Sequence, residues 1–411
     1  MSSLSLGFAM TRVATVFTLF AFAGSALLSA QTERNLFLFN GTTDGSEPQA
    51  GLIADSSGAL YGTTTWGGNT GAGYYGGTVF KLNPPSAHGS PWTESVLYEF
   101  QGGDFNTDAA NPYCTPVFDS AGNLYGTTED GGQYGSGTVF QLVPPLLAGG
   151  AWTENILYSF PDGTPLSGLA IDATGTLYGA KFYGDIFQLV PPAVAGGAWT
   201  YSDLYYFGSS TYIVRNLIFD GKGNLYGTAE QGGRYGYGLI FALRPPTTSG
   251  AAWTETNLYS FKGGIDGRTP MSSLTLKSGV LYGTTAYGGS AAFGTVYSLA
   301  PPTAPGSPWT QSVLYHFQGG SDGATPEGGV LFGNGGQLYG TTTAAGGTAD
   351  LGTIFKLTPP SITGNPWTET VLHSFTGKGN DGGRPEDTLL PLHGAFFGTS
   401  ATPGTVFEVS Q

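Results

Sequence analysis

Short runs in which hydrophobic and polar residues alternate recur along most of the chain. Within the run 78–82, Phe80 and Leu82 fall on one face of an extended chain and Lys81 falls on the other. Residues 95–100 alternate in the same way. Period-two alternation that is rich in β-branched and aromatic residues predicts β-strands. We therefore expect a protein built from many short strands.

A Leu-Tyr-Gly motif, varied once to Phe-Phe-Gly, divides the chain into repeating units. Its glycines are spaced 48–64 residues apart, at Gly62, Gly126, Gly179, Gly227, Gly283, Gly340 and Gly398. The first unit holds four strand-like runs, at residues 51–54, 59–64, 78–82 and 95–100. Self-similarity at such a period predicts a repeat architecture before any other fold is considered.

The connections between these runs recur as well. An Asp-x-x-Gly turn such as residues 55–58 joins the first two runs and predicts a tight hairpin. A glycine-rich loop such as residues 131–137 joins the second and third. Pro84 and Pro85, followed by Trp92, lie between the third and fourth, and proline ends a strand because it cannot donate a ladder hydrogen bond. Four antiparallel strands per unit, repeated radially, predict an all-β, seven-bladed β-propeller.

The two ends of the repeat array are complementary. The last unit stops after its third strand, residues 405–409, whereas residues 33–39 at the start match the fourth-strand pattern of residues 94–100. We therefore predict that the N-terminal strand completes the seventh blade, which closes the ring and leaves only short edges exposed. The alternative is an open β-solenoid, which would not need complementary half-units.

The phrase Gly-Gly-x-x-Gly-x-Gly-Thr-Val-Phe at residues 131–140 resembles the GloVer-type tandem repeat of exported bacterial proteins. Close matches are residues 232–241 and 346–355, so the resemblance extends over nearly all of the repeat region. It implies an exported bacterial protein with propeller-like repeats. It implies no catalytic residues.

Residues 1–30 are predicted to be a signal peptide and residues 31–411 a single propeller domain. Arg12 precedes an uncharged run, residues 13–28, which ends in small residues. This run is shorter than the roughly 20 residues that a spanning helix needs, which favours cleavage over an uncleaved membrane anchor. We expect a bacterial protein that is secreted, periplasmic or on the cell surface, with no membrane span after cleavage.

Composition narrows the range of partners. The formal net charge of −14 predicts repulsion from nucleic acid and from anionic membranes. Hydrophobic residues make up 40% of the chain and charged residues 10%, a balance that excludes disorder. We expect a monomer whose partner is a glycan or another protein.

Catalytic motifs are scarce. Cys114 is the single cysteine, so an intramolecular disulfide is impossible, and a small buried apolar residue is favoured over a nucleophile. The four histidines show no metal-ligand spacing: His88, His316, His373 and His393. We predict no cofactor, although paired carboxylates from different blades would leave no local motif.

Two sets of loops are expected on one face of the propeller. The glycine-rich set carries aromatic residues such as Trp66, Tyr134 and Tyr235. Aromatic rings can stack on sugars and nearby carboxylates can bind sugar hydroxyls, so these loops could form a carbohydrate site. The alternative is that these rings cover the glycines of neighbouring blades. The second set has an Asp-Gly pattern that could bind calcium or could form plain turns, at Asp44, Asp162, Asp266, Asp322 and Asp381.

The third unit departs from the pattern. Its glycine-rich loop is missing, because residues 181–184 run almost directly into the third strand, and the following junction, residues 208–212, lacks the Asp-Gly pattern. We predict a notch in the rim that forms the ligand groove. Its lining residues would be Lys181, Tyr183, Asp185, Tyr212 and Arg215.

Three functions remain open. The first is an exported binding or adhesion module, with carbohydrate as the ligand. The second is a glycan-active hydrolase or lyase with carboxylates at the central channel, and the third is a protein-interaction scaffold without a small ligand. The near-identity of the loops favours multivalent binding or scaffolding over catalysis.

Overall fold

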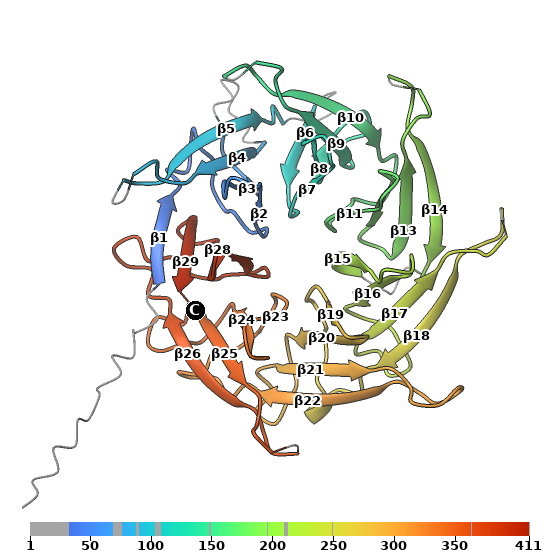
Figure 1. The fold of residues 1–411 in the computed structure, drawn as a ribbon, viewed down its shortest axis with the longest axis vertical. Coiled ribbons are helices and arrows are strands. Elements are labelled where there is room, and N and C mark those ends of the chain that lie inside the picture. Colours follow the sequence, from blue (N-terminus) through green and yellow to red (C-terminus); the bar gives the residue numbers. More distant parts are fainter. Residues whose placement is uncertain are drawn as a thin grey trace, which may run out of the picture. The chain divides into compact units, whose positions relative to one another are not determined.

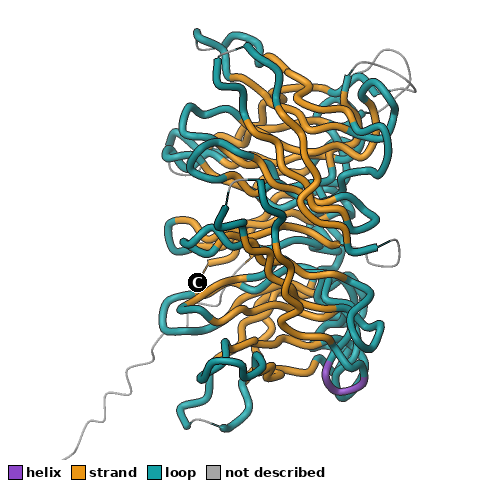
Figure 2. The backbone as a smooth tube through the Cα atoms, turned by 90° about the vertical axis from the view of Figure 1, so that its right-hand side faces the viewer, coloured by secondary structure: helices purple, strands orange, loops and turns teal. Residues whose placement is uncertain are grey.

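The computed structural model describes residues 33–68, 76–87, 90–102, 108–147, 149–194, 196–208, 213–248, 250–362 and 364–410. Seven antiparallel sheets surround a central axis, as the repeat predicted (Figure 1). In the side view of Figure 2 the strands occupy the middle of the ring and the loops lie at its two faces. The prediction of a seven-bladed β-propeller is confirmed.

The first four blades follow the chain in order. Blade 1 has β2 (Ile53–Ala54), β3 (Leu60–Thr64), β4 (Thr78–Asn83) and β5 (Thr93–Glu99). Blade 2 has β6 (Ala109–Pro112), β7 (Val117–Phe118), β8 (Leu124–Gly131), β9 (Thr138–Val143) and β10 (Thr153–Ser159). Blade 3 has β11 (Ala170–Ile171), β12 (Leu177–Ala180), β13 (Asp185–Val190) and β14 (Thr200–Tyr206). Blade 4 has β15 (Ile213–Phe219), β16 (Leu225–Ala229), β17 (Leu239–Arg244) and β18 (Thr254–Ser260).

The remaining blades lead back to the start of the chain. A short 3-10 helix, η1 (Gly264–Asp266), precedes blade 5, which has β19 (Thr275–Lys277), β20 (Val280–Thr285), β21 (Thr295–Ala300) and β22 (Thr310–His316). Blade 6 has β23 (Leu331–Phe332), β24 (Leu338–Thr342), β25 (Thr353–Thr358) and β26 (Thr368–Ser374). Blade 7 has β27 (Leu390–Leu392), β28 (Ala395–Ser400), β29 (Thr405–Ser410) and, as its outermost strand, β1 (Glu33–Leu38).

The strand β1 closes the ring. It pairs antiparallel with β29, from Glu33 opposite Val409 to Leu38 opposite Thr405. The two ends of the repeat array therefore share one sheet, beside the label C in Figure 1. The prediction that the N-terminal strand completes the last blade is confirmed.

Each residue of the Leu-Tyr-Gly-Thr motif makes a different contact in the structure. In blade 1, Leu60 is fully buried in the core, and Tyr61 donates its hydroxyl to Asp55 of the hairpin turn, 2.8 Å away. A Cβ on Gly62 would lie 2.5 Å from Cζ of Phe80, so only glycine leaves room for that ring. Thr63 donates to the carbonyl oxygen of Cys114 in the next blade. The motif therefore builds the blade and joins it to its neighbour.

Pairs of aromatic rings link every blade to the next. The phenylalanine that follows each fourth strand meets the aromatic residue of the third strand in the following blade, with ring centroids 4.7–5.3 Å apart. Phe39, just after β1, makes this contact with Phe80. Such edge-to-face pairs add to the stability gained by burying both rings.

Cys114 belongs to this inner framework. Its sulfur accepts the N–H of Thr127 at 3.1 Å, a role that the Ser272 hydroxyl plays for Thr284 in blade 5. Burial raises the pKa of the Cys114 thiol, which disfavours the reactive thiolate. The structural interpretation of Cys114 is thus the better one.

Replacement of Tyr297 by phenylalanine is expected to stabilise the protein. Tyr297 is fully buried, and its hydroxyl finds no hydrogen-bond partner within the described residues. Phenylalanine occupies this position in the other six blades, as Phe80 does in blade 1. Removal of a buried, unpaired hydroxyl should raise the free energy of unfolding by about 1 kcal/mol. Denaturant unfolding measures this directly, and a destabilised Tyr297→Phe variant would contradict it.

Candidate functional site

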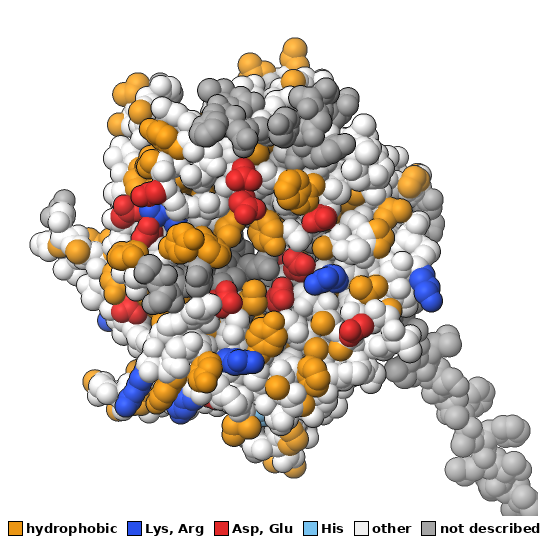
Figure 3. Space-filling model, turned by 180° about the vertical axis from the view of Figure 1, so that it is seen from behind, with side chains coloured by type: hydrophobic (Ala, Val, Ile, Leu, Met, Phe, Trp, Pro, Cys, Tyr) orange, Lys and Arg blue, Asp and Glu red, His pale blue; other side chains and the backbone are white. Residues whose placement is uncertain are grey.

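The loops that were expected to share one face are joined there by backbone bridges. Ser46, in the loop after β1, pairs with Trp66, and Arg268, in the loop after β18, pairs with Tyr287. The loop between strands two and three of a blade therefore lies against the loop that enters the blade. On the face shown in Figure 3, acidic and hydrophobic side chains gather around the centre.

The aromatic residues of these loops are about half exposed. Trp66, Tyr134 and Tyr235 expose 45%, 48% and 45% of their surface. The Arg234 guanidinium lies 5.6 Å from the ring centre of Tyr235. Their rings are thus available to stack on a ligand.

Two other aromatic residues of these loops cover glycines. A Cβ on Gly263 would lie 3.0 Å from the ring of Tyr237, and a Cβ on Gly319 would lie 2.7 Å from the ring of Phe293. The alternative interpretation, in which rings cover neighbouring glycines, therefore describes Tyr237 and Phe293.

The aspartates of the Asp-Gly loops are engaged within the protein. Asp44 accepts the N–H of Asn40, Asp266 that of Lys262 and Asp322 that of Gln318. Asp266 and Asp322 also accept a tyrosine hydroxyl of the preceding strand. Because each carboxylate orders its own loop, the geometry favours plain turns over calcium ligands.

Blade 3 replaces a recurring pair of threonines by an ion pair. In blade 1, the last residue of β3, Thr64, lies 2.8 Å from Thr78, the first residue of β4, measured between their hydroxyl oxygens. The same Thr–Thr contact is present in blades 2, 5 and 6. In blade 3 these two positions hold Lys181 and Asp185, whose Nζ and Oδ2 atoms lie 2.6 Å apart. Blade 7 has a Ser400–Thr405 contact at the same positions, so blade 3 carries an ion pair where five other blades carry two hydroxyls.

Lys181 is almost completely buried among three carboxylates. Its side chain is 7% exposed, and its Nζ lies 3.5 Å from Asp162 and 3.9 Å from Asp203, in addition to Asp185. Burial alone would lower the pKa of Lys181, but the bond to Asp185 and the charges of Asp203 and Asp162 outweigh it and leave the pKa raised. Lys181 is therefore a fixed cation with surplus negative charge around it.

Tyrosines extend this cluster outward. The Tyr201 hydroxyl donates to Asp203, and the ring of Tyr201 stacks on Tyr158 with centroids 4.2 Å apart. Burial and Asp203 together raise the pKa of Tyr201, so its hydroxyl remains a hydrogen-bond donor. An open pocket borders the cluster, lined by Asp185, Asp203, Leu204, Tyr205 and Tyr206.

The structure places only part of the predicted notch. Lys181 and Asp185 are in direct contact, while Tyr183 is 51% exposed and its ring packs against Phe182. Tyr212 lies outside the described residues, as does the side chain of Arg215, which falls within β15. Asp203 and Tyr201 were not predicted, and Asp162 was expected only as a member of the Asp-Gly loops. A position-by-position comparison of the repeats would have indicated Tyr201, since five other blades have glutamate there.

Near the centre of the ring, the carboxylate of Asp387 is also hydrogen-bonded within the protein. Asp387 of blade 7 accepts the N–H of Gly51 at 2.8 Å and the hydroxyl of Thr115 at 2.9 Å, which ties blades 1, 2 and 7 together. A Cβ on Gly51 would lie 2.9 Å from Thr115 Oγ1. The hydrolase alternative gains no support from this carboxylate, because its oxygens hold the walls of the channel together.

Solved structures resemble the chain in fold. The propeller domain of Cps50 (Swd1) from Myceliophteria thermophila matches with a TM-score of 0.52 at 9% identity, covering 92% of this chain and 100% of that one. YCF48 from Cyanidioschyzon merolae gives 0.48 at 13%, covering 92% and 98%. The calcium structure of a Trichoderma reesei carbohydrate-active enzyme of family AA12 gives 0.47 at 12%, covering 93% and 96%. At such identities the likeness shows the fold alone.

Comparison with curated proteins gives no match. In the described part of the chain, no helix is long and apolar enough to cross a membrane. The sequence model of the Gloeobacter/Verrucomicrobia repeat matches residues 15–211 and 180–410, which together span the blades described above. The chain therefore belongs to the Gloeobacter/Verrucomicrobia repeat family, as its glycine-rich repeats suggested.

Proposed function

We propose that this protein is an exported bacterial binding module for carbohydrate. Binding would take place on the face that carries the loops between strands two and three, with their exposed aromatic residues, and the principal site would be at blade 3. The observation that carries the proposal is the Lys181 cluster, the one place among the described blades where charged groups replace the repeat's hydroxyl or apolar pair and border an open pocket. Export rests on the signal peptide predicted for residues 1–30.

The chemistry around this pocket is suited to a neutral or cationic sugar. Asp203 and Asp185 offer carboxylate oxygens to hydroxyl groups, and their side chains are 57% and 23% exposed. Tyr206 is 61% exposed and offers a flat apolar ring for stacking. Lys181 is buried and already paired, so it fixes the carboxylates and is not itself the ligand contact. An excess of carboxylates over cations disfavours uronates.

Replacement of Tyr206 and Tyr183 by alanine is expected to weaken glycan binding by at least about tenfold, because each ring supplies about 1 kcal/mol of stacking. The measurement is a glycan-array screen of the purified protein in EDTA and in calcium, followed by titration calorimetry on the glycans that bind. Leu147→Ala is the matched control. Leu147 is 79% exposed in a loop between strands three and four, which leaves the sheet at the end opposite the aromatic loops.

A second variant separates blade 3 from the repeated loops. Changing Lys181 and Asp185 together to threonine restores the pair found in four other blades, so the protein should still fold. We expect this variant to lose binding. Unchanged binding would move the site to the repeated aromatics such as Trp66 and Tyr134, and no glycan binding by the wild-type protein would favour a protein-interaction scaffold.

A further inference from the structure

A similar group of side chains recurs where the outer strands of neighbouring blades meet. Between blades 1 and 2, the Tyr98 hydroxyl lies 3.1 Å from Asp108 and 3.3 Å from Glu154. Between blades 5 and 6, the Tyr315 hydroxyl lies 3.1 Å from Asp322. The members come from the fourth strand of one blade, the loop that follows it and the fourth strand of the next blade. We call this group the junction triad.

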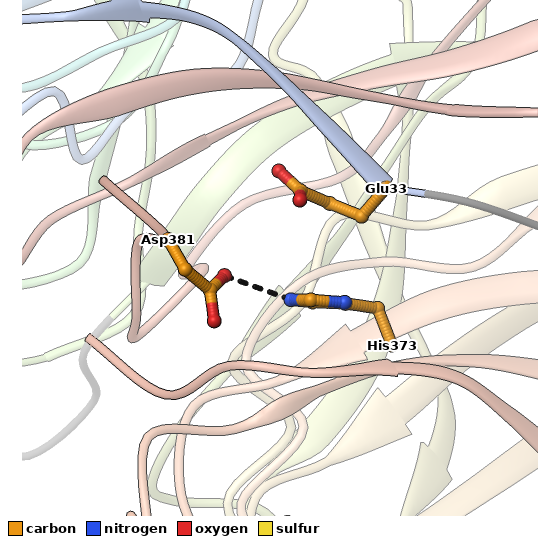
Figure 4. Close-up of side chains that lie close together, drawn as sticks. All are labelled: Glu33, His373 and Asp381. Atoms are coloured by element: carbon orange, nitrogen blue, oxygen red, sulfur yellow. Dashed lines mark hydrogen bonds and ion pairs between the residues drawn. The ribbon is translucent and has the colours of Figure 1, made fainter. Parts of the chain in front are cut away.

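The junction between blades 6 and 7 has a different triad. His373, at the position of Tyr98 and Tyr315, joins Asp381 and Glu33. The Nε2 atom of His373 lies 2.8 Å from Oδ1 of Asp381, and one ligand atom from each of the three residues lies within 4.8 Å of the others. Figure 4 shows the carboxylate of Glu33, on β1, above the contact between His373 and Asp381.

We propose that Glu33, His373 and Asp381 bind one divalent transition-metal ion, with Zn²⁺ the best match, and that this ion fastens the N-terminal strand to the ring. An imidazole nitrogen with two carboxylates is a ligand set that zinc accepts, leaving a fourth position for water. Calcium requires six to eight oxygen ligands and is a poor match. The proposal is independent of glycan binding, because the site lies on the outer strands of blades 6 and 7.

The surroundings favour a cation over an isolated hydrogen bond. Oε1 of Glu33 is buried and has no hydrogen-bond partner within the described residues. The same oxygen of Glu154 and Glu369 is also buried without a partner within the described residues. What differs at this junction is His373, whose imidazole nitrogen completes a ligand set with which a metal ion would satisfy the Glu33 oxygen. The second oxygen of Asp381 accepts the N–H of Thr376 at 2.8 Å, which holds the carboxylate in place as outer contacts do at metal sites.

The His373 side chain is 21% exposed and the Asp381 side chain 18%, so an ion and a water can reach the site. Binding would replace the proton shared by Nε2 and Oδ1 with the metal. Glu33 lies on β1 and His373 on β26, so the ion would connect two sheets that meet at the closure of the ring. No other described junction contains a histidine at this position.

The test is calorimetric titration of the EDTA-dialysed protein with ZnCl₂, together with thermal unfolding with and without zinc. We expect one zinc ion per chain, and a rise in Tm of about 3 °C when free zinc exceeds the Kd a hundredfold. His373→Tyr installs the residue of the other junctions and should abolish both effects. Glu33→Gln keeps the pairing of β1 and should weaken binding at least tenfold.

Two results would overturn the proposal. One is the absence of zinc binding to the wild-type protein. The other is binding to His373→Tyr or Glu33→Gln with the wild-type stoichiometry and affinity, which would mean an adventitious surface site. His393→Tyr is the control, because His393 is an exposed histidine in the turn between β27 and β28 and is not a member of the Glu33, His373 and Asp381 group, so its replacement should leave zinc binding unchanged. Glu33→Gln keeps the test decisive if His373→Tyr fails to fold.

Discussion

A chain that begins after Phe39 is expected to lose its cooperative unfolding transition and to aggregate. The truncation removes β1, so β29 loses its antiparallel partner from Glu33 to Leu38 and becomes an open sheet edge. It also removes Leu36 and Phe39, which are 9% and 6% exposed and pack in the core between blades 7 and 1. Loss of a buried phenylalanine alone costs about 3–5 kcal/mol, a large part of the stability of a domain.

Circular dichroism and size-exclusion chromatography measure this outcome. A synthetic peptide of residues 31–41 supplies the matched rescue, because it can add β1 back in trans by pairing with β29. The same peptide with Leu36→Asp should fail to rescue, since it would place a charge in the apolar cluster. If the truncated chain kept the wild-type Tm as a monomer, ring closure by β1 would not contribute to the stability of the propeller.

The fold could be predicted from the sequence because every repeat has nearly the same pattern of strand and turn residues. Leu60 is buried in the core, and Tyr61 donates its hydroxyl to Asp55. Gly62 lacks a side chain and so leaves room for the ring of Phe80. Repetition makes such a pattern visible without an alignment of relatives. The matching half-units at residues 33–39 and 405–409 revealed the closure for the same reason.

Local departures from the repeat were predicted less well. Blade 2 has an additional short strand, β6, which pairs with an extended β8 reaching Gly131. This pairing could not be predicted, because residues 109–112 lack the alternation of a half-buried strand. Asn111 has a φ of 57°, a conformation that a pattern of hydrophobic residues does not reveal.

The candidate sites show the same limit. Lys181 and Asp185 are neighbours in sequence and were recognised from the shortened loop, whereas Asp203 reaches them only through the pairing of β13 with β14. Glu33 and His373 lie near opposite ends of the chain, and their meeting depends on ring closure. Spacing rules for metal ligands assume nearby residues, so histidines that are scattered in the sequence were not indicated as ligands.

The carboxyl groups at the junction between blades 1 and 2 lead to a large pH effect. Burial, with a hydrogen bond to Asp108 and the charge of that residue, raises the pKa of Glu154 to about 9. Oε1 of Glu154 is buried without a partner, which matches a carboxyl that keeps its proton at neutral pH. The folded protein therefore holds this proton more tightly than the unfolded chain, in which a glutamate titrates near 4.5.

The sign of the effect follows from this difference. The contribution of Glu154 to stability is fully present below about pH 4.5 and is lost as the pH rises through the folded pKa of about 9. For one proton the slope cannot exceed about 1.4 kcal/mol per pH unit, and with solvent relaxation around the pair we expect a loss of about 2–3 kcal/mol between pH 5 and pH 8. Urea unfolding at a series of pH values would measure it.

Glu154→Gln is expected to remove most of this slope and to be more stable than the wild type at pH 8. Glutamine already occupies the equivalent position in blade 5. There the Gln311 amide donates to the carbonyl oxygen of Asp266 at 3.4 Å. The reverse change, Gln311→Glu, should place a second carboxyl beside Asp266 and steepen the fall in stability with pH. A wild-type slope in Glu154→Gln would show that other groups bind the proton, whereas opposite changes in the two variants would assign it to the outer junctions between blades.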